Sequence, residues 1–119
     1  EYLRTSASNV YALGDCAVVA GYWQPYVAPI LHGAKVLAAV LVGKPQDIIF
    51  PPMPIITKTP FCPCTVMPAI DDTPGRWQIE GAGIDYSAQF LDQHGQMLGF
   101  ALTGSATQKR RDFVQALSV

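Results

Sequence analysis

The sequence predicts an α+β fold, in which a mostly antiparallel sheet of about five strands and a C-terminal helix follow a separate strand–helix pair. Three observations predict this fold. After a proline-rich stretch at residues 51–54, the hydrophobic pattern changes to a period of two, which is typical of strands. Turn sequences then separate the apolar runs from one another. Finally, Gly104-Ser105 ends the last run and begins a helical stripe formed by Phe113, Val114 and Leu117.

The first predicted element is a strand at about residues 9–13, where β-branched and aromatic residues follow one another. It stops abruptly at Gly14-Asp15. A glycine at the end of a buried strand lets the backbone approach a ligand, and the carboxylate that follows offers an acceptor. Asp15 is therefore a candidate binding residue, although an Asp after a glycine can also simply cap a turn.

The next predicted element is a helix at about residues 29–43, reached through an aromatic loop at 21–26. Pro29 suits the first helical position, where its missing N–H has no helical partner to lose. Gly43 suits the position just beyond the helix. Because the helix is apolar on nearly all sides, we expect it to be buried on most of them.

The proline-rich connector at residues 51–54 separates two parts of different character. We therefore expect two domains, residues 1–44 and residues 45–119. Turns are predicted at residues 71–75 and 92–95, the latter with Asp first and Gly fourth as a type I turn prefers. The expected strands of the second part are about 54–59, 64–69, 76–81, 85–92 and 96–103, and its expected helix is about 105–117.

The composition is apolar for a chain of 119 residues, with 50% hydrophobic and 14% charged residues. Either the core is well filled, or the chain hides surface against a partner, a cofactor or a further domain. The net charge of −1 indicates neither nucleic acid nor an anionic membrane as a partner. No apolar run approaches the roughly 20 residues of a membrane span. The chain starts at Glu1 without a methionine, which suggests a fragment.

Three cysteines, an odd number in a chain without a disulfide framework, favour a reducing compartment and hence the cytoplasm. Cys62-Pro63-Cys64 is spaced too closely for an ordinary structural zinc pair. An unrelated α+β domain with a metal or redox site at these two cysteines remains an alternative. Gly81-Ala82-Gly83 lacks a third glycine and a following helix, so we interpret it as a turn rather than a nucleotide loop.

Four segments together carry a family resemblance. They are YALGDCA at residues 11–17, PYVAPI at 25–30, PPMPIITKTP at 51–60 and GFALTG at 99–104. This succession resembles the C-terminal portion of the rubredoxin–NAD(+) reductases, which are FAD-dependent pyridine-nucleotide reductases. The resemblance covers nearly all of the chain. It implies that residues 1–44 are the C-terminal remnant of an FAD-binding domain, and that residues 45–119 are the end domain of the reductase.

The resemblance implies three flavin contacts. Asp15 would accept hydrogen bonds from ribityl hydroxyls. Val27 would lie by the flavin ring just ahead of the helix, whose positive end would face the pyrimidine edge of the ring. Lys58, on the first strand of the end domain, would reach the ring from the other side. From the residues alone, Val27 is by default a core residue and Lys58 a lysine on a strand face.

The resemblance also implies that the parent protein passes electrons from NADH through FAD to rubredoxin. This chain contains no Gly-x-Gly-x-x-Gly loop of the kind that holds a dinucleotide pyrophosphate. NADH would therefore bind through another domain, and we expect the chain alone to be inactive and to hold FAD weakly or not at all. No side chain here need act as an acid, a base or a nucleophile. The alternative is a non-catalytic module that binds rubredoxin or associates with itself as a homodimer.

Overall fold

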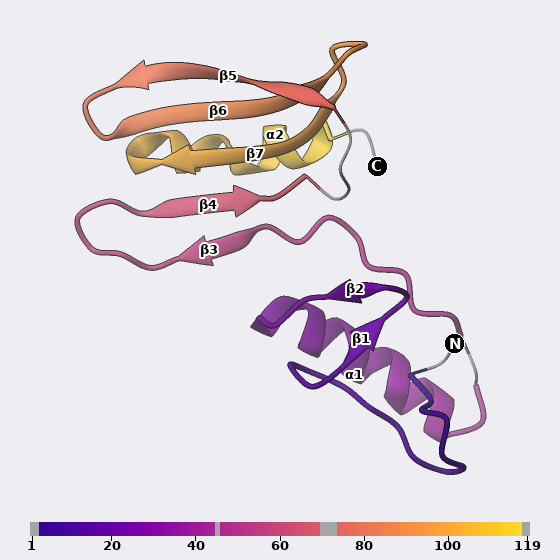
Figure 1. Ribbon diagram of the computed structural model, residues 1–119. Coiled ribbons are helices and arrows are strands. Elements are labelled where there is room, and N and C mark those ends of the chain that lie inside the picture. Colours follow the sequence, from indigo (N-terminus) through magenta and orange to yellow (C-terminus); the bar gives the residue numbers. More distant parts are fainter. Residues whose placement is uncertain (1–2, 45, 70–73, 118–119) are drawn as a thin grey trace. The chain divides into compact units, whose positions relative to one another are not determined.

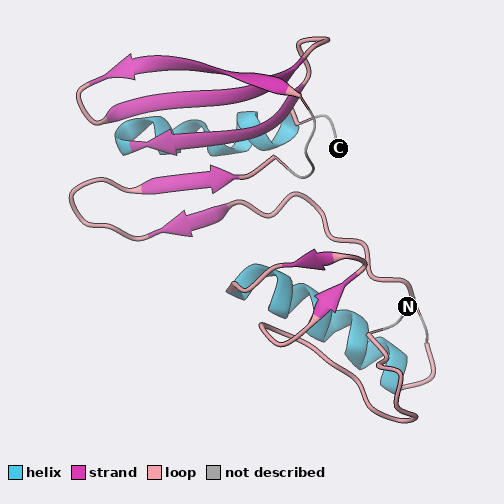
Figure 2. Cartoon of the chain, in the orientation of Figure 1, coloured by secondary structure: helices cyan, strands magenta, loops and turns pink. Residues whose placement is uncertain are grey.

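The computed structural model describes residues 3–44, 46–69 and 74–117. The chain divides into two compact units, Glu1–Met53 and Pro54–Val119 (Figure 1). The first unit contains a helix and a two-stranded sheet, and the second contains a five-stranded antiparallel sheet and a C-terminal helix (Figure 2). The predicted α+β class is thus confirmed.

The first unit has no strand at residues 9–13, so this prediction is wrong. Tyr11 forms only an isolated antiparallel bridge with Arg4, and the amide of Thr5 donates to the carbonyl of Val10 at 3.0 Å. Asn9, with a φ of 61°, turns the chain back on itself. A strand exists only where a neighbouring strand pairs with it, and among the described residues this segment forms backbone–backbone hydrogen bonds only with the few residues before it.

A short hairpin comes next, formed by β1 (Val18–Val19) and β2 (Tyr22–Trp23). The two residues between these strands, Ala20 and Gly21, both have positive φ angles, 52° and 86°. This is the geometry of a type I′ turn, whose twist matches that of paired strands.

Helix α1 (Val27–Leu41) begins two residues earlier than predicted. Pro29 is therefore the third helical residue, where its N–H would still lack a helical partner. At the other end, the amide of Gly43 donates to Val40 at 3.1 Å and the amide of Lys44 donates to Ala39 at 2.9 Å. With a φ of 76° at Gly43, this is a Schellman motif, and the predicted stop at the glycine is confirmed.

The helix is not buried on most sides. Its buried residues are Pro29, Gly33 and Val36, whereas Leu31 and Leu41 are more than 60% exposed. A methyl group on Gly33 would lie 2.5 Å from the side chain of Leu13, which shows how closely one face is packed. The expectation of burial was wrong for this chain because the described segments of the first unit cover only that one face.

The sheet of the second unit has the strand order β3-β4-β7-β6-β5, and every neighbouring pair is antiparallel. All five strands lie where the sequence predicts them, within two residues at each end. The predicted turn at residues 92–95 is present, because the amide of Gly95 donates to the carbonyl of Asp92 at 3.1 Å. Most of the predicted turn at 71–75 lies outside the described residues. The strands are β3 (Ile55–Thr57), β4 (Cys64–Met67), β5 (Gly75–Ala82), β6 (Asp85–Asp92) and β7 (Met97–Thr103).

The single helix expected at 105–117 is divided into a 3₁₀ helix, η1 (Gly104–Lys109), and α2 (Arg110–Gln115). Its first turn is tightened by the hydroxyl of Thr107, which donates to the carbonyl of Gly104 at 2.7 Å. The free amide of Ser105 donates to a carboxylate oxygen of Asp85 at 2.6 Å. The cap of this helix is therefore supplied by Asp85 of β6, not by Gly104-Ser105 as the sequence suggested.

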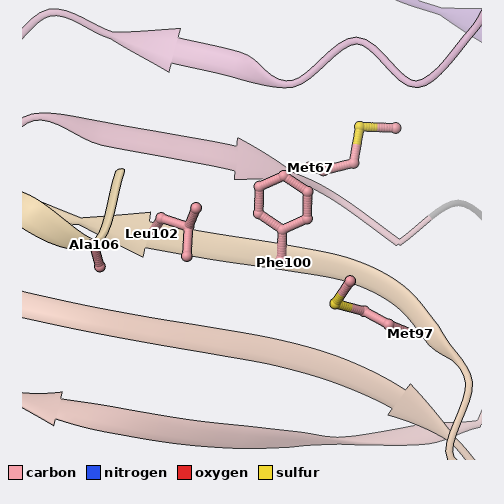
Figure 3. Close-up of a cluster of buried hydrophobic side chains, with 5 residues drawn as sticks. All are labelled: Met67, Met97, Phe100, Leu102 and Ala106. Atoms are coloured by element: carbon pink, nitrogen blue, oxygen red, sulfur yellow. The ribbon is translucent and has the colours of Figure 1, made fainter. Parts of the chain in front are cut away.

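The core of the second unit lies between the sheet and these helices. Phe100 and Leu102 of β7 are fully buried, and Phe113 packs edge-on against Phe100 with 5.4 Å between ring centroids. Figure 3 shows how the buried side chains gather along β7 and the neighbouring β4. The buried cluster consists of Met67, Met97, Phe100, Leu102 and Ala106, with Leu91, Phe113, Val114 and Leu117 packed against it.

Among the described residues, no helix is both long and apolar enough to cross a membrane.

Candidate functional site

Asp15 lies in a tight turn that follows Leu13. The amide of Ala17 donates to the carbonyl of Gly14 at 2.9 Å, and Gly14 has a φ of 88° that favours glycine. The indole Nε1 of Trp23 donates to the backbone carbonyl of Asp15 at 3.0 Å. The side chain of Asp15 is exposed, and within the described ranges no hydrogen bond engages its carboxylate. The turn is thus held by its backbone, and the carboxylate is left available.

The N-terminus of α1 is uncapped. Its N-cap residue, Tyr26, makes no side-chain cap hydrogen bond, and no acidic residue stands in the first helical turn. The partial positive charge of the helix end is therefore not neutralised by the helix's own residues. Val27, the first helical residue, is 68% exposed, so it is not a core residue of this unit.

Tyr26 is fixed by its own hydroxyl, which donates to the carbonyl of Met53 at 2.9 Å. Burial raises the pKa of this phenol above its ordinary value, so the neutral donor form is favoured. This contact ties the start of α1 to the end of the first unit.

The Asp15 turn lies against the start of α1. A methyl group on Gly14 would be 3.8 Å from two side-chain atoms of Ile30, which belongs to the first turn of the helix. A small cavity separates the two segments, lined among others by Gly14, Pro29 and Gln24. The side-chain oxygen of Gln24 is buried and has no hydrogen-bond partner among the described residues. The cavity has a volume of about 20 Å³, which is room for one water molecule to pair with this oxygen.

A larger hollow of about 400 Å³ lies elsewhere in the first unit. It is lined by residues 3–5, 12, 16–20 and 47–48, which include Arg4 and Asp47.

Lys58 belongs to the second unit. The sequence placed it on the first strand of that unit, but β3 ends at Thr57 and Lys58 opens the loop to β4. Its side chain is exposed. The structure therefore places the Gly14-Asp15 turn against the first turn of α1 within the first unit, and it describes Lys58 within the second.

The three cysteines are free thiols. Cys62 and Cys64 are partly buried, and Cys16 donates weakly to the carbonyl of Leu13 at 3.5 Å. Across the described part of the chain, no group of three or more His, Cys, Asp or Glu side chains could hold a metal ion.

Sequence reasoning did not single out Phe61 or Asp85. Phe61 is 94% exposed at the β3–β4 loop. Asp85 supplies the helix cap described above. The signal for Phe61 was present in the two flanking prolines, Pro60 and Pro63, which indicate a stiff loop around an apolar residue. Asp85 could not have been found, because nothing local to it predicts which helix it caps.

A family model described as "Rubredoxin binding C-terminal domain" matches residues 47–117. The chain belongs to this family. The matched residues include the whole five-stranded sheet and the helices that follow it. The predicted resemblance to the C-terminal portion of the rubredoxin–NAD(+) reductases is confirmed by this match and by the relatives that follow.

Over 108 residues the chain is 44% identical to a "Rubredoxin-NAD(+) reductase" of Alcanivorax borkumensis. The match covers 91% of this chain and 28% of that protein. It is 38% identical to a "Rubredoxin-NAD(+) reductase" of Acinetobacter baylyi, over 92% of this chain and 28% of that protein. A "Nitric oxide reductase FlRd-NAD(+) reductase" of Vibrio vulnificus is 36% identical over 98% of this chain and 30% of its own length. The chain therefore spans less than a third of these relatives.

The fold also matches a solved structure, the NADH:rubredoxin oxidoreductase from Clostridium acetobutylicum. The TM-score is 0.70, over 98% of this chain and 30% of that one. At 19% identity this likeness shows a shared fold.

Proposed function

We propose that the chain is the C-terminal portion of an FAD-dependent oxidoreductase that passes electrons from NADH through flavin to rubredoxin in the cytoplasm. The first unit would complete an FAD-binding domain, and the second would be the end domain that meets rubredoxin. NADH would bind through a domain outside this chain. The proposal is supported by the names of the relatives and by the family of residues 47–117.

The geometric observation that carries the flavin part is the position of the Gly14-Asp15 turn against the first turn of α1. Asp15 would accept hydrogen bonds from ribityl hydroxyls, and its exposed carboxylate needs several donors to offset its loss of water. The uncapped helix end beside Val27 would favour negative charge on the pyrimidine edge of the ring. A cation at Lys58, brought to the ring from the other side, would act in the same sense.

Bound FAD would supply the conversion between two-electron and one-electron chemistry. In the overall reaction NADH loses a hydride, two iron(III) ions of rubredoxin each gain one electron, and NAD⁺ and one proton are released. The residues of this chain would bind, orient and tune, and none would act as an acid or a nucleophile. The chain alone would be inactive, since its sequence has no glycine-rich pyrophosphate loop.

The test uses the full-length reductase that contains this chain. Asp15→Asn removes the charge but keeps the size of the side chain, and we expect FAD to be held about 5- to 150-fold more weakly, which corresponds to about 1–3 kcal/mol. Asp47→Asn is the matched control, because it removes an exposed carboxylate from the same unit. FAD affinity measured by fluorescence titration decides the matter. Equal affinity in the wild type and in the Asp15 variant would contradict the assignment.

A second candidate is a self-associating module. It is favoured by the apolar side chains that α1 leaves exposed, among them Val27, Leu31 and Leu41. Purified chain that elutes as a dimer in gel filtration would support this function, and a monomer would contradict it. Purified chain that is yellow with bound FAD would support the flavin-binding role of the first unit.

A further inference from the structure

The β3–β4 loop of the second unit, residues 58–63, presents one aromatic side chain to solvent. Phe61 is 94% exposed, more than any other large hydrophobic residue that the structure describes. Single exposed apolar side chains are common on protein surfaces, so exposure alone assigns no role. What distinguishes Phe61 is the rigidity of the loop that carries it.

The loop is held at both ends by hydrogen bonds. The hydroxyl of Thr57 donates to the carbonyl of Cys64 at 3.2 Å, and the hydroxyl of Thr59 donates to the carbonyl of Cys62. The amide of Gly104, at the start of η1, donates to the carbonyl of Pro63 at 2.9 Å and so attaches the loop to the core of the unit.

The composition of the loop stiffens it further. Pro60 stands before Phe61, and Pro63 follows two residues later. Because proline fixes its own φ angle and restricts the residue before it, little backbone freedom is left to lose on binding. A rigid aromatic residue at a loop tip loses little entropy on docking and buries a large apolar area, which are the properties of a binding anchor.

The position of the loop indicates its partner. Phe61 is three residues beyond Lys58, so their Cα atoms are at most about 11 Å apart. If Lys58 reaches the flavin as proposed above, the tip of this loop lies beside the flavin site. A protein that takes electrons from the flavin must come close to the same place. The loop also falls within residues 47–117, the part of the chain that matches the rubredoxin-binding family.

We propose that Phe61 is the hydrophobic anchor by which this end domain docks rubredoxin. This inference rests on the proposed function. Truncation of such an anchor affects binding strongly, because the apolar contact at the centre of an interface carries most of the affinity. It affects folding little, since the side chain makes almost no contact within the unit.

The experiment compares the full-length reductase with its Phe61→Ala variant. The affinity for rubredoxin is measured by titration, and flavin reduction is measured separately with ferricyanide, a small acceptor that needs no docking surface. We expect Phe61→Ala to weaken rubredoxin binding at least ten-fold and to leave ferricyanide reduction by NADH unchanged. Phe61→Leu should restore most of the affinity, because it restores an apolar side chain.

The matched control is Ile79→Thr. Ile79 is 62% exposed on β5, the strand at the opposite edge of the same sheet from β3, and threonine keeps the β-branched shape. This variant should bind rubredoxin as the wild type does.

Three results would overturn the inference. The first is an unchanged affinity for rubredoxin in Phe61→Ala. The second is a parallel loss of FAD and of ferricyanide reduction, which would mean that Phe61 packs inside the reductase. The third is a wild-type dimer that the variant abolishes, which would mean that Phe61 docks a second copy. A wild-type reductase that does not reduce rubredoxin at all would instead refute the proposed function.

Discussion

Thr103 joins the end of β7 to the start of β6, and its replacement by valine tests how much this junction stabilises the fold. Its hydroxyl donates to the carbonyl of Ile84 at 2.7 Å and accepts from the amide of Tyr86 at 3.0 Å. One hydroxyl therefore connects the end of β7 to the last residue of the β5–β6 turn and to the start of β6. Valine keeps the volume and the β-branch but can form neither hydrogen bond.

The magnitude follows from these two contacts. Each hydrogen bond contributes about 0.5–1.5 kcal/mol, so the loss of both would cost about 1–3 kcal/mol. Ile84 is 56% exposed and Tyr86 is 40% exposed, so water can replace part of what is lost. We therefore expect Thr103→Val to lower the free energy of unfolding by about 1–2 kcal/mol.

Urea unfolding of the second unit measures this change. Trp77 reports on the unit because it packs against Phe90 with 5.3 Å between ring centroids, and a Trp23→Phe background removes the fluorescence of the first unit. Thr57→Val is the matched control, because it removes a single hydroxyl hydrogen bond at the sheet edge. It should cost about 0.5 kcal/mol or less. An unfolding midpoint for Thr103→Val equal to that of the wild type, or no larger a loss than in the control, would refute the reasoning.

Two further predictions concern charge. In the full-length reductase, Lys58→Met should lower the flavin reduction potential, since it removes a cation that favours the reduced state. Because Lys58 is exposed, the free energy of unfolding should stay within about 0.5 kcal/mol of wild type. Potentiometry that finds the same potential would place Lys58 away from the ring. Because the pKa of Tyr26 is raised in the folded state, its contribution to stability is present below its ordinary pKa, near 10, and is lost as the pH rises above it. Unfolding measured between about pH 9 and 11 should therefore show a steeper loss in the wild type than in Tyr26→Phe; identical slopes would contradict the shift.

The second unit could be predicted from the sequence because its signals are local. Period-two patterns mark β5 to β7. In the Asp-x-x-Gly turn at 92–95, Gly95 has a φ of 79° and the carboxylate of Asp92 accepts hydrogen bonds from two amides at 2.8 Å. Strand order was not accessible in this way. It depends on β4 pairing with β7 across more than thirty intervening residues, and no local pattern encodes that choice.

The first unit was predicted less well because its elements depend on neighbours. The apolar run at 9–13 has the composition of a strand but pairs with nothing beyond a single bridge. The apolar helix α1 has the composition of a buried helix but is covered on one face only. The composition of a segment indicates how much apolar surface it could bury. It does not indicate whether other elements are present to cover that surface. Asp15 could be singled out because a glycine–carboxylate turn is a local feature, whereas the contact of Gly14 with Ile30 of α1 is not.

The GFALTG motif at residues 99–104, which helped to identify the family, is explained by packing and not by chemistry. A methyl group on Gly99 would lie 2.6 Å from the backbone nitrogen of Ala69, and one on Gly104 would overlap Asp85. Between them, Phe100 and Leu102 fill the core, and Thr103 joins the β6 turn. These five positions of the motif therefore serve the fold. Under the proposed function, the choice of electron acceptor would depend on residues that the fold leaves free, and Phe61 is one of them because its side chain is 94% exposed.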